Sequence, residues 1–138
     1  MIIGRKKELN EIREAYKSEY SQFIAVYGRR RVGKTFLVRE AFDYSFSFQH
    51  TGVANLNMKG QLEAFRMSLM EQGHKDCPVL KSWLEAFNEL KVIVKSSKKR
   101  KKVLFIDEIS WIDTPKSGFL AALENFWNGW CSARKDVL

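Results

Sequence analysis

The chain alternates between short apolar runs and longer stretches with helical spacing. Two runs, "FIAVY" at residues 23–27 and "VLFI" at 103–106, are continuously apolar and shorter than a typical helix. Runs of this kind predict buried parallel strands. A third segment, "YSFSFQ" at residues 44–49, alternates aromatic and polar side chains, which is also typical of a strand.

Between these runs, apolar residues recur at spacings of three and four, which predicts helices. The predicted helices cover residues 6–20, 34–42, 57–72, 78–94 and 119–130. We expect Asn57 to cap the third helix and Pro78 to be the first residue of the fourth. Loops are predicted at residues 95–102 and 110–118. Strands that alternate with helices predict an α/β fold with a parallel sheet and flanking helices.

Composition agrees with a folded domain of ordinary size. The chain has 138 residues, of which 45% are hydrophobic and 29% charged. It contains no apolar stretch of about 18 residues, so we expect no membrane span. It also shows no signal-peptide pattern at its start, and we therefore expect a cytoplasmic protein.

The cysteines and histidines give no local metal motif. Cys77 and Cys131 belong to no CxxC pair, and His50 and His74 have no partner at ligand spacing. We expect two reduced thiols, with a disulfide or a metal site as the alternative.

The chemistry with the clearest sequence signal is phosphate binding. Residues 28–35 fit the pattern G-x-x-x-x-G-K-[ST], and they lie between a predicted strand and a predicted helix. The glycines let backbone N–H groups approach an anion, and the helix N-terminus adds partial positive charge. Lys34 is expected to reach the β- and γ-phosphates, and Thr35 to bind Mg²⁺. The predicted nucleotide-binding residues of this loop are Gly28, Arg29, Arg30, Arg31, Val32, Gly33, Lys34 and Thr35.

A second element of the same site follows the strand predicted at residues 103–106. Asp107 and Glu108 stand at its carboxyl end, where ligands bind in parallel α/β sheets. This is a Walker B pattern, so we expect Asp107 to help hold Mg²⁺. A carboxylate one residue further on can orient a water molecule for attack on the γ-phosphorus, which is the role predicted for Glu108.

These motifs together resemble those of the P-loop ATPases of the AAA+/STAND superfamily, and in particular a prokaryotic AAA ATPase group. The resemblance rests on "IIGRKKEL" at residues 2–9, "VYGRRRVGKTFLV" at 26–38 and "VLFIDEISWI" at 103–112. It implies that Ile3, Gly4 and Arg5 line the adenine end of the site. It also implies that the loop arginines belong to the family pattern.

The resemblance further implies that residues 1–138 form the N-terminal part of an ATPase domain. In the family's strand order, 5-1-4-3-2, a fourth strand separates the strands predicted at residues 23–27 and 103–106. We expect the fourth and fifth core strands, the lid and the C-terminal domains to be missing here. The sheet would then have open edges about 9–10 Å apart. Such edges would pair directly, recruit another copy or receive the rest of a longer protein.

Residues 95–102, "KSSKKRKK", carry six positive charges and no acidic residue, while the whole chain has a net charge of +8. One interpretation is a solvated loop. The other is a contact to nucleic-acid phosphates, although no aromatic residue interrupts the run to stack on bases.

The function that this sequence predicts is Mg²⁺-dependent ATP binding and hydrolysis, with Lys34 and Glu108 as catalytic residues. A nucleotide-dependent switch with little turnover, and in some contexts a DNA contact, is the alternative. A phosphotransferase is a third interpretation, but the pair Asp107 and Glu108 favours water as the acceptor. The biological role stays open at this point, and the fragment alone can be inactive.

Overall fold

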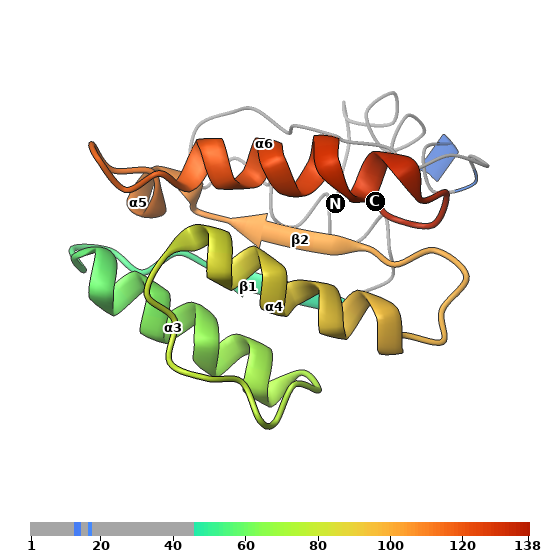
Figure 1. Cartoon of the computed structure of the whole chain (residues 1–138), viewed down its shortest axis with the longest axis horizontal. Coiled ribbons are helices and arrows are strands. Elements are labelled where there is room, and N and C mark those ends of the chain that lie inside the picture. Colours follow the sequence, from blue (N-terminus) through green and yellow to red (C-terminus); the bar gives the residue numbers. More distant parts are fainter. Residues whose placement is uncertain (1–12, 15–16, 18–45) are drawn as a thin grey trace, which may run out of the picture.

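The computed structural model describes residues 13, 14, 17 and 46–138 (Figure 1). In chain order the elements are β1 (Phe48–Thr51), α3 (Met58–Glu71), α4 (Trp83–Ser96), β2 (Leu104–Asp107), α5 (Ile109–Ile112), α6 (Phe119–Gly129) and a 3₁₀ turn (Cys131–Ala133). Residues 13, 14 and 17 are helical, in agreement with the first predicted helix. The strand predicted at residues 23–27 and the helix predicted at 34–42 lie outside the described residues.

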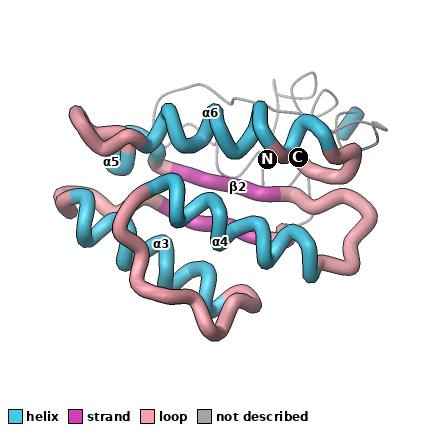
Figure 2. The backbone as a smooth tube through the Cα atoms, in the orientation of Figure 1, coloured by secondary structure: helices cyan, strands magenta, loops and turns pink. Residues whose placement is uncertain are grey.

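The two described strands form a parallel pair, seen side by side in Figure 2. Phe48 lies opposite Leu104 and Thr51 opposite Asp107. A parallel pair needs a long crossover connection, and here α3 and α4 supply it. This part of the chain is therefore α/β with a parallel sheet, as the sequence predicts.

One face of the sheet packs on the helices. Side chains alternate along a strand, so Phe48 and His50 point to the same face as their neighbours Leu104 and Ile106. Phe48 is fully buried and its ring lies 5.3 Å from that of Phe65 on α3. The helices thus cover the face that carries these four side chains.

Helix α4 lies between α3 and α6 in this layer (Figure 1). Its Trp83 meets the ring of Phe65 on α3 at 5.3 Å and that of Phe119 on α6 at 5.1 Å, both edge to face. Each of these rings is almost completely buried. Full burial of an aromatic side chain stabilises a fold by roughly 2–3 kcal/mol, so this aromatic cluster is a main source of stability. Phe119, Ala122 and Phe126 of α6 are buried in this core.

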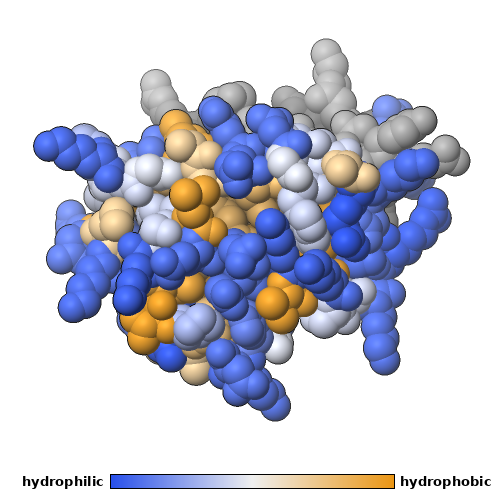
Figure 3. Space-filling model, viewed as in Figure 1, coloured by the Kyte–Doolittle hydropathy of each residue, from blue (hydrophilic) through white to orange (hydrophobic). Residues whose placement is uncertain are grey.

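One face of the molecule is mostly polar. On the face shown in Figure 3, hydrophobic side chains form small separate patches among hydrophilic ones. Isolated patches of this size are normal for a folded protein surface.

Several predicted boundaries hold and others are wrong. Helix α3 begins after Asn57, whose side chain accepts a hydrogen bond from the Gly60 amide at 2.8 Å, as predicted. Helix α4 does not begin at Pro78. Its cap is Ser82, whose hydroxyl accepts from the Glu85 amide at 3.2 Å, so residues 78–81 are connection. Ser82 supplies the side-chain oxygen that accepts from a free amide of the first turn, whereas Cys77, the residue before Pro78, has no such oxygen.

Three further corrections concern strands and loops. Among the described residues, β1 spans 48–51, so Phe46 precedes it and it extends two residues beyond the predicted end at Gln49 because pairing with β2 continues to Thr51; residues 44 and 45 of the prediction lie outside the described residues. α5 occupies residues 109–112, part of which was predicted as loop. α4 continues through Ser96, so the basic segment begins inside a helix.

The last residues of the chain pair with the start of β2, in parallel. Leu138 accepts from the Leu104 amide at 2.6 Å and donates to Lys102 at 2.8 Å. Asp136 anchors this segment with two 2.9 Å hydrogen bonds from Arg134 and a 2.9 Å ion pair with Lys102. Hydrogen bonds from Arg134, and then from Lys102, lower the Asp136 pKa to about 2. The end of the chain therefore pairs with the segment that leads into β2.

Candidate functional site

The carboxyl ends of β1 and β2 lie at one edge of the sheet. Asp107 is the last residue of β2, faces Thr51 across the ladder and is 6% exposed. The backbone continues the pairing one step further, since the Gly52 amide donates to the Asp107 carbonyl at 2.9 Å. In parallel α/β sheets, ligands bind beyond this edge.

The chain turns sharply between Asp107 and Glu108. The Asp107 carboxylate oxygen Oδ1 accepts from the Glu108 amide at 2.9 Å. Glu108 has left-handed backbone angles, φ 56° and ψ 43°, which are uncommon for a residue with a side chain. Such a conformation costs of order 1–3 kcal/mol and persists only where neighbours hold it. Helix α5 then begins at Ile109.

Gly52 is one of the neighbours that hold this turn. A Cβ atom at Gly52 would overlap the backbone oxygen of Glu108 and lie 2.8 Å from Cγ1 of Ile112. Only a residue without a side chain lets the segment after β1 pass this close to the turn after β2.

Gln61 on α3 joins the same two segments. Its side chain is 1% exposed, and its Nε2 donates to the carbonyls of Val53 at 2.5 Å and Trp111 at 3.1 Å. Its Oε1 accepts from the Val53 amide at 3.1 Å. The buried amide therefore bridges the segment after β1 and helix α5.

This arrangement fixes the backbone around two carboxylates at the carboxyl edge of the described strands. The carboxylate of Asp107 is the hard oxygen donor that Mg²⁺ prefers, and Glu108 adjoins it. Both predicted Walker B residues are thus placed at this edge. The other predicted site residues lie outside the described residues: Ile3, Gly4, Arg5, Gly28, Arg29, Arg30, Arg31, Val32, Gly33, Lys34 and Thr35.

His50, on β1 beside this edge, has a partner that its sequence neighbours do not reveal. Its Nδ1 lies 2.7 Å from the Ser68 hydroxyl on α3. Burial lowers the His50 pKa to about 4, so the imidazole is neutral at physiological pH. Its role is in packing and polar contact with α3.

The basic segment at residues 95–102 is tied in part to the chain end. Lys101 is only 4% exposed and its Nζ donates to the Lys135 carbonyl at 3.3 Å. Lys102 pairs with Asp136. At least two of the six cations therefore have structural partners within the chain.

Within the described part of the chain, no helix has the length and apolar character needed to cross a membrane.

Comparison with known proteins assigns most of the chain to a family. A family described as an ATPase domain predominantly from Archaea matches residues 2–130. An uncharacterized ATP-binding protein of Methanocaldococcus jannaschii is 40% identical over 40 residues, covering 29% of this chain and 68% of that protein. A second uncharacterized protein of the same organism is 34% identical over 59 residues, covering 43% of this chain but only 13% of the relative's length. No solved structure matches.

Proposed function

The chain belongs to this family of ATPase domains, and on that basis we propose that it binds ATP with Mg²⁺ and hydrolyses the β–γ bond. The observation that carries the proposal is the fixed turn of Asp107 and Glu108 at the carboxyl edge of the parallel sheet. One of the two relatives is described as an ATP-binding protein, which supports ATP as the nucleotide. The finer assignment to the AAA+/STAND type is part of the same proposal.

In this proposal the loop at residues 28–35 binds the phosphates. Its backbone N–H groups and Lys34 contact phosphate oxygens, while Thr35 and Asp107 hold the metal ion. The donor set fits, since a hydroxyl and a carboxylate are oxygen ligands. Bound Mg²⁺ would neutralise charge on the phosphate oxygens.

Glu108 orients the attacking water in this scheme. Its left-handed backbone directs the chain out of β2 into α5, so its position is set by the turn and not by a flexible loop. A carboxylate that accepts a proton from water makes the oxygen a better nucleophile toward phosphorus. Binding requires no such group, so Glu108 distinguishes hydrolysis from binding alone.

The test separates the two steps with two variants. Lys34→Ala should weaken binding of a fluorescent ATP analogue in the presence of Mg²⁺. Glu108→Gln should retain that binding and lower phosphate release by about a hundredfold or more. Glu124→Gln, an exposed carboxylate on α6, and Lys75→Ala, an exposed lysine, are the matched controls and should behave as wild type.

Each result has a separate meaning. Normal turnover by Glu108→Gln would refute the role given to Glu108. Tight binding of ATP by the wild-type protein with negligible phosphate release would identify a nucleotide-dependent switch in place of an enzyme. Absence of ATP binding by folded wild-type protein would refute the proposal as a whole.

A further inference from the structure

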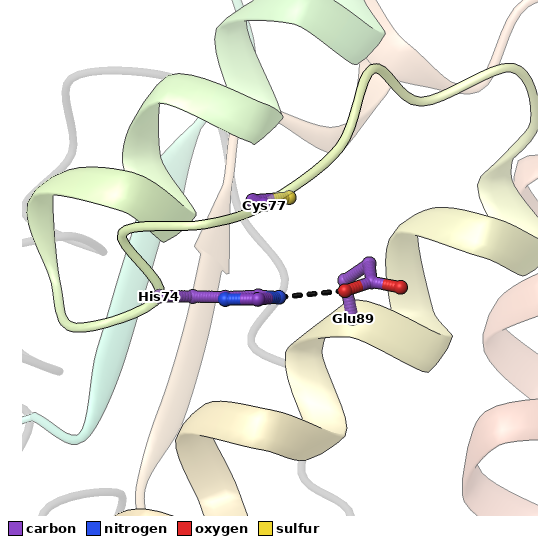
Figure 4. A group of neighbouring side chains, drawn as sticks. All are labelled: His74, Cys77 and Glu89. Atoms are coloured by element: carbon purple, nitrogen blue, oxygen red, sulfur yellow. Dashed lines mark hydrogen bonds and ion pairs between the residues drawn. The ribbon is translucent and has the colours of Figure 1, made fainter.

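A cluster of three chemically different side chains lies in the helical layer, on elements separate from the turn of Asp107 and Glu108. His74 follows α3, Cys77 lies in the connection between α3 and α4, and Glu89 is on α4 (Figure 4). The Nε2 atom of His74 lies 2.6 Å from Oε1 of Glu89. One ligand atom from each residue, including Sγ of Cys77, lies within 4.8 Å of the other two.

The sequence shows no partner for His74 or Cys77 at ligand spacing, but the fold brings Glu89 close to both. Glu89 is twelve residues beyond Cys77, and only the reversal of the chain between α3 and α4 brings it close. The connection itself is held against α3, because Nε of Arg66 donates to the Cys77 carbonyl at 3.1 Å. The three ligand atoms therefore come from segments that the fold already positions.

The donors are an imidazole nitrogen, a thiol sulfur and a carboxylate oxygen, all of which bind Zn²⁺ in proteins. Ligands around a tetrahedral Zn²⁺ lie about 3.3–3.7 Å apart, which follows from bond lengths of 2.0–2.3 Å. In the cluster, the ligand atoms lie at most 4.8 Å apart, which is somewhat more than the spacing around zinc. The 2.6 Å between His74 and Glu89 is shorter than that spacing. To surround one ion, the ligand atoms of His74 and Glu89 would move apart, and any pair near the 4.8 Å limit would move together, by rotation of the side chains.

The accessibility of the three residues fits a metal better than a nucleophile. Cys77 is 3% exposed, while the side chains of His74 and Glu89 are 12% and 23% exposed. A thiol buried to this degree is typically inert toward nucleophilic chemistry when no metal is bound. A coordinated cation deprotonates a thiol outright, and the partly exposed side admits the ion and water.

We propose that His74, Cys77 and Glu89 bind one divalent cation of the zinc class, with water as the remaining ligand. The bound ion would join the end of α3, the following connection and α4. Its role would be to fix this connection in place. The site is independent of the proposed nucleotide chemistry.

The test uses Co²⁺, which takes zinc sites and has a visible spectrum. The full chain, prepared without a polyhistidine tag and under reducing conditions, is titrated with Co²⁺ and then with Zn²⁺. We expect one equivalent to bind, with a sulfur-to-cobalt charge-transfer band and visible absorption of tetrahedral intensity. Zn²⁺ should displace the Co²⁺ and raise the melting temperature, since a ligand that binds only the folded state stabilises it.

Variants identify the ligands. Cys77→Ser should abolish the charge-transfer band, while Cys131→Ser, which removes the other buried thiol, should retain it. Glu89→Gln keeps the size of the side chain and a hydrogen bond to His74 but should weaken Zn²⁺ binding more than about tenfold. Glu85→Gln, one turn earlier on α4, is its control.

A wild-type chain that shows no charge-transfer band at saturating Co²⁺ would overturn the proposal. A band that persists in Cys77→Ser would overturn it as well, as would equal Zn²⁺ affinity in Glu89→Gln and wild type. The wild-type titration gives an answer even if a variant does not fold.

Discussion

Gly52→Ala should destabilise the protein and disturb the turn of Asp107 and Glu108. The added methyl group would overlap the backbone oxygen of Glu108 and approach Cγ1 of Ile112 to 2.8 Å and its Cδ1 to 3.2 Å. The Ile112 side chain can rotate away, but the carbonyl belongs to a residue whose left-handed angles are already constrained. Relief of the overlap must therefore move backbone.

The expected cost follows from overpacking in other proteins, which is typically about 1–3 kcal/mol. Because backbone is involved, we expect the upper end, about 3 kcal/mol. With a urea m-value of about 2 kcal/mol per molar, that cost lowers the midpoint of unfolding by about 1.5 M. Phosphate release in Mg²⁺ and ATP should fall as well, because the turn that positions Glu108 is displaced.

Gly129→Ala is the matched control for this prediction. Gly129 is the last residue of α6, and a Cβ atom there would find its nearest neighbour 3.9 Å away, at Nδ2 of Asn125. Alanine should be neutral or slightly stabilising at such a position. If Gly52→Ala unfolds at the same urea concentration as wild type or Gly129→Ala, the packing argument for the turn is wrong.

Two further predictions test other contacts. Gln61→Leu keeps the size of the side chain but removes its hydrogen bonds to both backbone groups of Val53 and to the Trp111 carbonyl. It should lower the free energy of unfolding by about 1–3 kcal/mol, and a urea midpoint equal to that of wild type would contradict this. The pKa of Asp136 is about 2 in the folded chain, against an ordinary value of 3.8. The ionised carboxylate therefore stabilises the fold fully above about pH 4, and this stabilisation is lost as the pH falls toward 2. Between about pH 4 and pH 2, the free energy of unfolding measured in urea should therefore fall more for wild type than for Asp136→Asn. An equal fall in both proteins would refute the role given to Asp136.

The sequence predicted the elements whose signals are local. Asn57 capped α3 as expected, since its side chain needs only the amide three residues on. β2 and α6 were also found, because a continuous apolar run and a long apolar stripe do not depend on distant contacts. α4 was misplaced because Pro78 outweighed the sequence Ser82-Trp83-Leu84-Glu85, which is itself a capping signal.

What the sequence did not predict depends on distant pairs. Gln61 interrupts an apolar face, and its importance lies in carbonyls that only the fold brings near. The sequence shows a glycine at position 52, but not why a side chain cannot fit there. The atoms that would overlap it belong to residues more than fifty positions later in the chain. The position of Asp107 and Glu108 at the carboxyl end of β2 was predictable, because the acidic pair directly follows the apolar run at residues 103–106.

The bridge made by Gln61 has a consequence for local opening of the structure. The amides of Gly52 and Val53 and that of Trp111 are held by bonds to Asp107, Gln61 and Glu108, respectively. Breaking any of these hydrogen bonds while the Gln61 side chain remains buried would leave buried polar groups without partners. We therefore expect the three hydrogen bonds to break together. In native-state hydrogen exchange, the three amides should show one common opening free energy and lose protection as a single cooperative unit.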